Sequence, residues 1–317
     1  MSEFDVLCFG ETMAMFVAEQ TGDLAAVELF RKRIAGADSN VAIGLARLGF
    51  DVAWLSRVGD DSLGRFVVDT LKKEGLDCSH VAVDPRYPTG FQFKGRQDDG
   101  TDPAVEYFRK GSAASHLSLA DLGPRLLAAS HVHTTGIPPA LSASAHELSR
   151  HVMTQMRSRG RSVSFDPNLR PQLWPSQAQM IDSINALAAQ ADWVLPGLAE
   201  GQLLTGLQRP EDIAAFYLDR GAEMVAIKLG AEGAYFRTAK DQGHVPGCPV
   251  EKVIDTVGAG DGFAVGVISA LLEGFEVADA VARGNWIGSR AVQSPGDMEG
   301  LPLRNELPAT SQWPRTA

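Results

Sequence analysis

The stretch DTVGAGDGFAVG, residues 255–266, decides how the rest of the chain is interpreted. Its clustered glycines precede an apolar run, which is typical of a turn that cradles phosphate at the start of a helix. No lysine lies among them, and Asp261 stands where an incoming negative charge is least favourable. Two interpretations remain open from these residues: an anion-binding turn, or a glycine-rich turn in which Asp261 caps the helix.

Two common nucleotide-binding motifs are missing from the chain. It contains no Gly-Lys dipeptide, so it has no Walker A loop. No GxGxxG follows the first apolar run, so the fingerprint of a dinucleotide-binding fold is also missing. The turn around residue 258 must therefore be explained in another way.

Composition narrows the class of protein. The chain has 317 residues, 44% of them hydrophobic, with 29 basic and 39 acidic side chains and a formal charge of −10. Such a charge disfavours a nucleic-acid partner, and no apolar run approaches the roughly 18 residues of a membrane span. The first ten residues do not read as a signal peptide, and three widely spaced cysteines favour reduced thiols. We expect a cytoplasmic protein.

Apolar runs alternate with amphipathic stretches along most of the chain, which predicts an α/β fold with a mostly parallel sheet covered on both faces. Residues 12–35 and 87–116 interrupt this alternation with short β-like stretches, and we expect them to form a small separate sheet within a single domain of residues 1–317. The tail after about Gln293 is expected to be surface loop. Strands are predicted at residues 6–9, 52–55, 131–133, 162–165, 193–195 and 224–227, and helices at 39–48, at 63–74 and after residue 258.

Polar residues cluster after four of the predicted strands. In open α/β sheets, ligands bind outside the carboxyl ends of the strands, so these residues mark one edge as a candidate site. They are Thr134, Thr135 and Gly136 after one strand, Asp166, Asn168 and Arg170 after the next, then Glu200, and finally Lys228 and Gly230.

Residues 255–266 fit, position by position, the second signature of the ribokinase-like carbohydrate kinases, the PfkB family. The segment AGADSNVAIGLARLGFDVAWLSRVGDD, residues 35–61, resembles the first signature, although Asp38 replaces the small residue usual there. VAIKLGAEGAYF, residues 225–236, resembles the nucleotide-site strand and turn. The resemblance covers about residues 5–295. It implies a three-layer αβα sandwich with a small β lid, and a kinase that uses ATP and Mg²⁺.

The resemblance also implies roles for particular residues. Asp261 would take the proton from the sugar hydroxyl, and the N–H groups of Gly258, Ala259 and Gly260 would form the anion hole. Glu200 would organise Mg²⁺ through water. The asparagine that usually accompanies this glutamate is replaced by Gly197, so Asp166 or Asn168 could share in placing the Mg²⁺ ion. The alternative interpretation of Glu200 is a purely structural acid in the first turn of a helix. The nucleotide would be bound by Asn168, Lys228, Gly230, Gly233 and Asn285.

Two arginines point to the substrate class. Arg109 follows the alternating segment AVEYFRK, which places Tyr107 and Arg109 on one face, and Arg170 follows a predicted core strand. Two guanidinium groups in one pocket would match a carboxylate by charge and by paired donors. Both segments resemble those of the branch of the family that phosphorylates 2-keto-3-deoxygluconate. In that branch, the matching residues that bind the sugar acid would be Gly36, Asn40, Gln92, Tyr107, Arg109 and Arg170.

Several alternatives remain open. The chain could be another sugar kinase of the same fold, such as a fructokinase or a 5-keto-2-deoxygluconate kinase, or a non-catalytic sugar- or nucleotide-binding regulator. His131 and His133 share a strand face and have a spacing that can suit a metal, but no third ligand lies near them in the sequence. The resemblance further implies a homo-oligomer, a dimer or larger.

Overall fold

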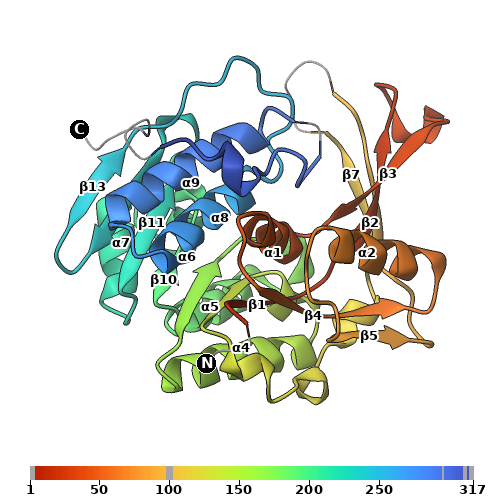
Figure 1. Ribbon diagram of the computed structural model, residues 1–317, viewed down its shortest axis with the longest axis horizontal. Helices are drawn as coiled ribbons and strands as arrows, with labels where there is room; N and C mark the ends of the chain where they lie inside the picture. The colour runs from red at the N-terminus through yellow and green to blue at the C-terminus, as the bar shows by residue number, and fades with distance from the viewer. Residues whose placement is uncertain (1–3, 98–102, 295, 310–312, 314–317) are drawn as a thin grey trace.

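The computed structural model describes residues 4–97, 103–294, 296–309 and 313. Part of the predicted lid, residues 98–102, both ends of the predicted domain and parts of the tail lie outside the described residues. Figure 1 shows a large sheet flanked by helices, and a smaller sheet that stands away from it. None of the described helices is long and apolar enough to cross a bilayer.

The large sheet has nine strands in the order β13-β12-β11-β10-β9-β8-β1-β4-β5. Pairing is parallel from β11 to β5, and β12 and β13 are added antiparallel at one edge. The mostly parallel sheet predicted from the sequence is confirmed. The strands are β1 (Val6–Phe9), β4 (Val52–Gly59), β5 (Val81–Asp84), β8 (His131–Thr135), β9 (Ser162–Asp166), β10 (Trp193–Val194), β11 (Met224–Lys228), β12 (Ala234–Thr238) and β13 (Gln242–Val245).

Two apolar cores lie on the two faces of this sheet. Successive side chains of a strand point to opposite faces, and in β1 Val6 and Cys8 enter one core while Leu7 and Phe9 enter the other. The fold is therefore the predicted three-layer αβα sandwich. The first core is covered by α1 (Ala37–Arg47), α2 (Ser62–Lys73), α8 (Ala259–Leu272) and α9 (Val277–Ala291), and the second by α4 (Ala143–Ser158), α5 (Gln177–Ala188), α6 (Leu198–Thr205) and α7 (Pro210–Leu218); α3 (Pro138–Leu141) is a single turn.

The small sheet has four strands in the order β3-β2-β6-β7. They are β2 (Met13–Ala18), β3 (Phe30–Ala35), β6 (Phe91–Lys94) and β7 (Val105–Phe108), and all fall within the two segments that interrupt the αβ alternation. β2 pairs with β6 in parallel, and the other pairs are antiparallel. Gln92 and Lys94 are buried on one face of β6, while Phe91 and Phe93 lie on the other face.

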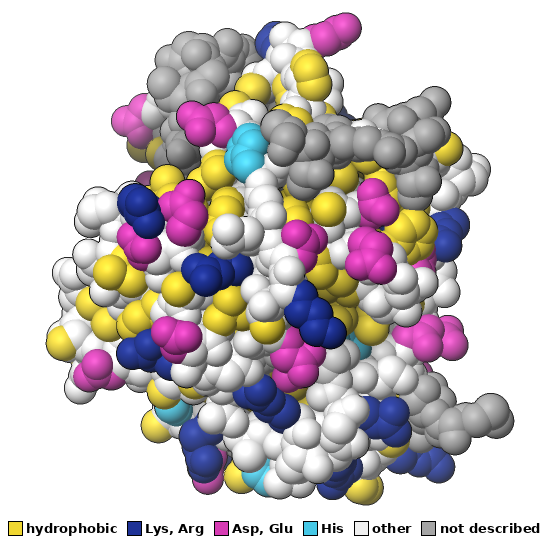
Figure 2. Space-filling view, turned by 90° about the vertical axis from the view of Figure 1, so that its left-hand side faces the viewer, with side chains coloured by type: hydrophobic (Ala, Val, Ile, Leu, Met, Phe, Trp, Pro, Cys, Tyr) yellow, Lys and Arg dark blue, Asp and Glu magenta, His cyan; other side chains and the backbone are white. Residues whose placement is uncertain are grey.

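The tail after Gln293 is only partly a surface loop. Met298, Leu301 and Trp313 are buried against the first core, and Arg283 of α9 stacks over the Trp313 ring. The prediction of a surface loop is wrong for these residues, because the tail is irregular but covers apolar side chains of the α8–α9 layer. Figure 2 shows acidic and basic side chains interspersed over one side of the molecule.

Candidate active site

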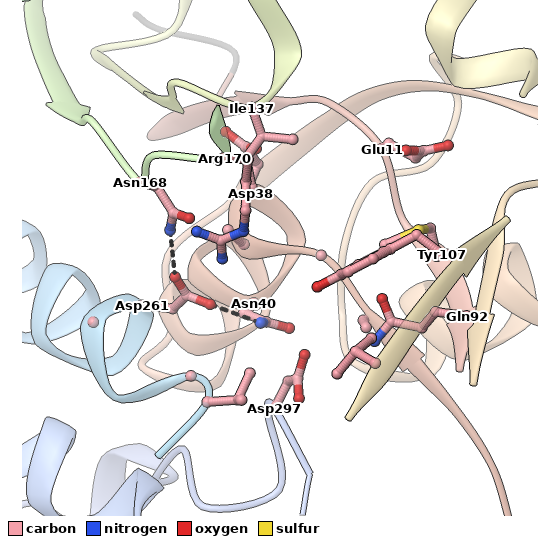
Figure 3. A pocket seen from close by; sticks show the side chains of 18 of the residues that line it. Glu11, Asp38, Asn40, Gln92, Tyr107, Ile137, Asn168, Arg170, Asp261 and Asp297 are labelled. Carbon is pink, nitrogen blue, oxygen red and sulfur yellow. Dashed lines mark hydrogen bonds between the residues drawn. The ribbon is translucent and has the colours of Figure 1, made fainter. Parts of the chain in front are cut away.

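A cavity of about 410 Å³ lies at the carboxyl edge of the large sheet, where α1 and α8 begin, and the small sheet forms its other wall (Figure 3). This is the edge at which the sequence places its polar residues. Asp261, Asn40, Tyr107, Arg109 and Arg170, which are far apart in the sequence, all line it. Predicted site residues from both sheets therefore share one cavity.

The glycine turn that precedes α8 needs glycine at residue 258. Gly258 has φ +85°, a left-handed conformation that favours glycine, and a Cβ there would lie 2.4 Å from the main-chain oxygen of Asp297. α8 begins at the next residue, so the first N–H groups of the helix have no partner within it. These N–H groups and the positive end of the helix dipole form a place that suits an anion.

Asp261 lies in the first turn of α8 and is 7% exposed. The Asn40 Nδ2 atom donates a hydrogen bond of 2.8 Å to its carboxylate, and Asn168 Nδ2 donates one of 3.3 Å. Burial raises the pKa of Asp261 to about 7; the Asn40 hydrogen bond lowers it, while the nearby carboxylates of Asp166 and Asp297 raise it. A carboxylate with this pKa can accept a proton near neutral pH.

Lys228 brings a fixed positive charge to the same turn. Its Nζ atom lies 2.6 Å from Asp166 Oδ2, at the end of the neighbouring strand β9, and 3.4 Å from the point where a Cβ of Gly260 would stand. Burial lowers the pKa of Lys228, but the carboxylates of Asp166 and Glu200 outweigh this and raise it above its ordinary value. The ammonium group therefore stays protonated beside the turn.

Of the residues predicted to bind the sugar, Tyr107 and Gln92 lie across the cavity from Asp261, whereas Asn40 and Arg170 lie on the same side as Asp261 (Figure 3). Tyr107 of β7 and Gln92 of β6 point into it from the small sheet, and Arg170 points into it from the loop after β9 (Figure 3). Gly36 precedes α1, and a Cβ there would lie 2.5 Å from the main-chain oxygen of Glu11. Within the described part of the chain, Arg170 forms no ion pair and donates to the main-chain oxygen of Leu169.

Arg109 differs from Arg170 in its partners. It is 8% exposed, and its Nη2 atom lies 2.6 Å from Oε2 of Glu11, a carboxylate that also accepts a hydrogen bond from Ser112. The two arginines do line one cavity, as the sequence predicts. However, Glu11 neutralises the charge of Arg109, so Arg170 carries the unpaired charge of the two.

Three residues predicted to bind the nucleotide do not line this cavity. Gly233 has φ +99°, and a Cβ there would lie 2.1 Å from the main-chain oxygen of Val245. Asn285 Nδ2 donates to that same oxygen at 3.0 Å and to Pro246 at 3.1 Å. Gly233 and Asn285 thus meet at the end of β13, and Gly230 begins the turn that leads to Gly233.

Glu200 has a clear structural role. Its two carboxylate oxygens accept backbone N–H groups, Gly197 N at 2.7 Å and Leu169 N at 2.7 Å, so the side chain caps α6 and ties it to the loop after β9. Asn168 and Asn40 each have a buried side-chain oxygen without a hydrogen-bond partner. Among the described residues, no group of three or more His, Cys, Asp and Glu side chains could hold a metal ion by itself.

The two histidines of β8 are held by serines. His131 lies 2.8 Å from the hydroxyls of Ser162 and Ser164, and His133 lies 2.8 Å from Ser164. Burial lowers the pKa of both rings, that of His133 to about 3. The alternative of a metal site at these residues gains no support, because the rings are buried and hydrogen-bonded to serines, which cross-links β8 and β9.

Sequence reasoning missed four charged residues at the cavity. Glu11, Lys94 and Asp297 line it, and so does Asp38, which was noted in the sequence only as a departure from the usual small residue. Asp38 accepts hydrogen bonds from the Thr135 main chain at 2.8 Å and hydroxyl at 2.9 Å, and burial raises its pKa to about 7. Lys94 had one available signal: it stands two residues after Gln92, on the same face of β6.

A family model described as pfkB family carbohydrate kinase matches residues 3–304. The chain belongs to the pfkB family of carbohydrate kinases. The family and the kinase class predicted from residues 255–266 are thereby confirmed.

Relatives and solved structures agree with this assignment. The chain is 55% identical to the 2-dehydro-3-deoxygluconokinase of Bacillus subtilis (strain 168), and the match covers 99% of this chain and 97% of the relative. It is 33% identical to the 2-dehydro-3-deoxygluconokinase of Thermoproteus tenax, with 95% of this chain and 92% of the relative covered. The PfkB protein of Polaromonas sp. JS666 superposes with a TM-score of 0.90 at 56% identity, covering 96% and 99% of the two chains. An E. coli protein solved in complex with ATP and Mg²⁺ gives a TM-score of 0.89 at 27% identity, covering 98% and 99%.

Proposed function

We propose that this carbohydrate kinase transfers the γ-phosphoryl group of ATP to the 6-hydroxyl of 2-keto-3-deoxy-D-gluconate, which is also called 2-dehydro-3-deoxygluconate. One observation carries the proposal: Asp261 and the unpaired guanidinium of Arg170 face the same cavity. A sugar acid has a carboxylate at one end and a primary hydroxyl at the other, so it can engage both groups at once. The name of the Bacillus subtilis relative supports the same substrate.

Asp261 acts as the general base. It takes the proton of the 6-hydroxyl as the oxygen attacks the γ-phosphorus, and Asn40 and Asn168 hold its carboxylate in place. Phosphoryl transfer has a loose transition state in which positioning and charge stabilisation matter more than a strong base. A carboxylate with a pKa of about 7 therefore suffices near neutral pH.

The N–H groups of Gly258, Ala259 and Gly260 form the anion hole for the phosphoryl group in transit, and Lys228 adds its charge beside them. The nucleotide extends from there over Lys228, Gly230 and Gly233 toward Asn285, with Asn168 at the phosphate end.

The residues present fit a Mg²⁺ ion that is held mainly by phosphate and water. Asn168 offers a buried oxygen without a partner, and Glu200 lies beside it with both oxygens already bonded to backbone N–H groups. Mg²⁺ keeps several waters and needs few protein ligands. Glu200 would therefore act through water, and the ion would neutralise charge on the phosphates.

The sugar acid is recognised by residues from both sheets. Arg170 pairs with its carboxylate, and Arg109 contributes its remaining nitrogen, Nη1, while Glu11 fixes the rest of that side chain. Tyr107 and Gln92 bind the chain of hydroxyls from the small sheet, and Gly36 and Asn40 border it from α1.

The small sheet acts as a lid of the single kinase domain and excludes water, which otherwise competes as acceptor. Its outer face carries a cluster of aromatic rings that includes Phe91, Phe93 and Phe108. We propose that this face pairs with a second copy of the chain in a homo-oligomer, and that the enzyme works in the cytoplasm, where ATP is available.

A coupled kinase assay tests the proposal with 2-keto-3-deoxygluconate, 5-keto-2-deoxygluconate, fructose and ribose as acceptors. We expect the highest kcat/KM for 2-keto-3-deoxygluconate. A higher value for fructose or ribose would reject the substrate, and a higher value for 5-keto-2-deoxygluconate would assign the enzyme to that sugar acid instead. Failure to transfer phosphate to any of them would favour a binding protein.

A further inference from the structure

Lys94 is a lysine of the small sheet whose charge is buried against the large one. Its side chain, on β6, is 2% exposed. The Nζ atom lies 2.5 Å from Asp255 Oδ2 and 3.1 Å from Asp297 Oδ1. Asp255 precedes α8 and Asp297 follows α9. Both belong to the body, by which we mean the large sheet, its covering helices and the segments that connect them. One ammonium group from the small sheet therefore joins two segments of the body.

These two aspartates hold the glycine turn from both sides. Asp255 Oδ1 accepts a hydrogen bond of 3.1 Å from Val257 N, which shapes the entry to the turn. The main-chain oxygen of Asp297 packs against Gly258, at the place that a Cβ would need. Any displacement of either aspartate would therefore move the N–H groups of residues 258–260.

The charges make this arrangement dependent on Lys94. The side chains of Asp255 and Asp297 are 9% and 6% exposed, and without the lysine two buried carboxylates would face each other. Burial lowers the pKa of Lys94, but Asp297 and Asp255 more than offset this and raise it, so the lysine stays charged. Asp297 also faces Asp261 and raises the pKa of that residue.

We propose that Lys94 is a positioning residue that makes formation of the anion hole depend on closure of the small sheet. This inference rests on the proposed function, in which residues 258–260 form the anion hole and Asp261 is the base. When the small sheet closes over the sugar, Lys94 enters between Asp255 and Asp297 and fixes the turn. When it is open, the two carboxylates repel each other and the turn loosens, which disfavours ATP hydrolysis without sugar.

A second ion pair between the same regions provides a matched control. Arg33 of β3 pairs with Glu299, and both side chains are 23% exposed. This pair also joins the small sheet to the segment after α9, but neither residue lines the cavity. If anchoring the small sheet were all that mattered, Arg33→Met and a Lys94 variant would have comparable effects.

The main variant is designed to stay folded. Lys94→Met alone leaves two buried carboxylates without a cation between them, so it is combined with Asp297→Asn, which keeps the net charge of the cluster at its original value. We expect this double variant to lose about 100-fold in kcat, because a small misplacement of the catalytic groups has effects of that size. The KM values for ATP and for the sugar acid should change less. Turnover equal to that of Arg33→Met would overturn the proposal.

Two further readouts separate charge and coupling from simple loss of packing. In Lys94→Ala combined with Asp297→Asn, added ethylammonium or propylammonium chloride should restore turnover, whereas sodium chloride at equal ionic strength should not. In amide hydrogen exchange, the sugar acid with a non-hydrolysable ATP analogue should protect residues 91–94 and 255–260 in the parent protein, but only residues 91–94 in the double variant. Absence of amine rescue, or equal protection of 255–260 in both proteins, would contradict the proposal.

Asp261→Asn distinguishes this inference from the proposed function. If that variant keeps its turnover, the assignment of the base fails and the inference fails with it. If it loses turnover while the Lys94 double variant keeps it, the proposed function stands and the role of Lys94 is rejected.

Discussion

The two sheets of the molecule differ in how they use their faces. The large sheet is covered on both sides, so most of its strand residues are buried, and its cavity-lining residues lie at the carboxyl edge. The small sheet has a polar inner face with Gln92, Lys94 and Tyr107, and an outer face rich in phenylalanine. Under the proposed function, the large sheet and its helices would carry out phosphoryl transfer, and the small sheet would help to bind the sugar acid and close over it.

The two arginines show this division at the level of single residues. Arg170 follows β9 of the large sheet and has an unpaired charge, whereas Arg109 follows β7 of the small sheet and is tied to Glu11, in the link between β1 and β2. The cation without an acidic partner thus follows a strand of the large sheet. The small sheet brings its arginine already neutralised, together with the tyrosine that precedes it by two residues.

The largest effect is expected at the edge of the large sheet. Asp261→Asn removes the base, so kcat should fall about 1000-fold, which is within the usual range for general base catalysis, while the KM for ATP changes little. Steady-state kinetics check this. Asp279→Asn alters an aspartate in the first turn of α9 that does not line the cavity, and it should behave like the parent protein. Near-normal turnover of Asp261→Asn would show that Asp261 is not the general base.

A smaller effect is expected from the cation of the recognition site. Arg170→Gln should lower kcat/KM for 2-keto-3-deoxygluconate about 100-fold, the size expected when a carboxylate loses a charged partner, with ATP binding unchanged. The exposed Arg150 of α4 provides the control, Arg150→Gln. Equal losses of kcat/KM for a neutral sugar and for the sugar acid would show that Arg170 does not bind the carboxylate.

A substitution at Glu200 tests whether this residue, which caps α6, also helps to bind Mg²⁺ through water. Glutamine has a single acceptor oxygen and can keep only one of the hydrogen bonds from Gly197 N and Leu169 N, so Glu200→Gln should remain folded with a somewhat lower thermal stability. We expect the Mg²⁺ concentration at half-maximal rate to rise about tenfold, as is common when a residue that acts on a metal indirectly is changed. An unchanged Mg²⁺ dependence would leave Glu200 with the capping role alone.

The smallest effect concerns pH. Because the pKa of Asp261 is about 7, kcat/KM should fall as the pH drops below that value and the carboxylate takes up a proton. Asp297→Asn removes a negative charge that raises this pKa, so the acid limb should move to lower pH by a fraction of a unit. The exposed Asp182→Asn should not move it, and an acid limb that stays in place in Asp297→Asn would contradict the coupling. The other charged groups that influence Asp261 are Asp38 on α1, Asp166 at the end of β9 and Lys228 on β11.

Six of the nine strands of the large sheet, and the helices α1, α2 and α8, could be predicted from the sequence because each has a local signal, whereas β5, β12 and β13 were not predicted. Apolar runs such as residues 6–9 and 224–227 are buried on both faces, and the helices between them have helical periodicity. The tail could not be predicted in the same way. Met298, Leu301 and Trp313 are buried by packing against the α8–α9 layer, and nothing in their own neighbourhood has a regular period.

The site could be predicted where a continuous motif carries it, as at residues 255–266. Site residues were missed where an ion pair joins two segments that are far apart in the sequence. Lys94 and Asp255 are 161 residues apart, and Arg109 and Glu11 are 98 apart, so neither pair has a local signal. For this reason the sequence contains the charge of Arg109 but does not show that Glu11 lies against it.

One measurement tests most directly the claim that the body and the small sheet together form a site for a sugar acid. It is the ratio of kcat/KM for 2-keto-3-deoxygluconate to kcat/KM for 3-deoxyfructose, the analogue with an alcohol in place of the carboxylate. We expect the parent protein to prefer the acid by about 100-fold and Arg170→Gln to lose most of that preference. Equal kcat/KM values for the two sugars in the parent protein would contradict the account.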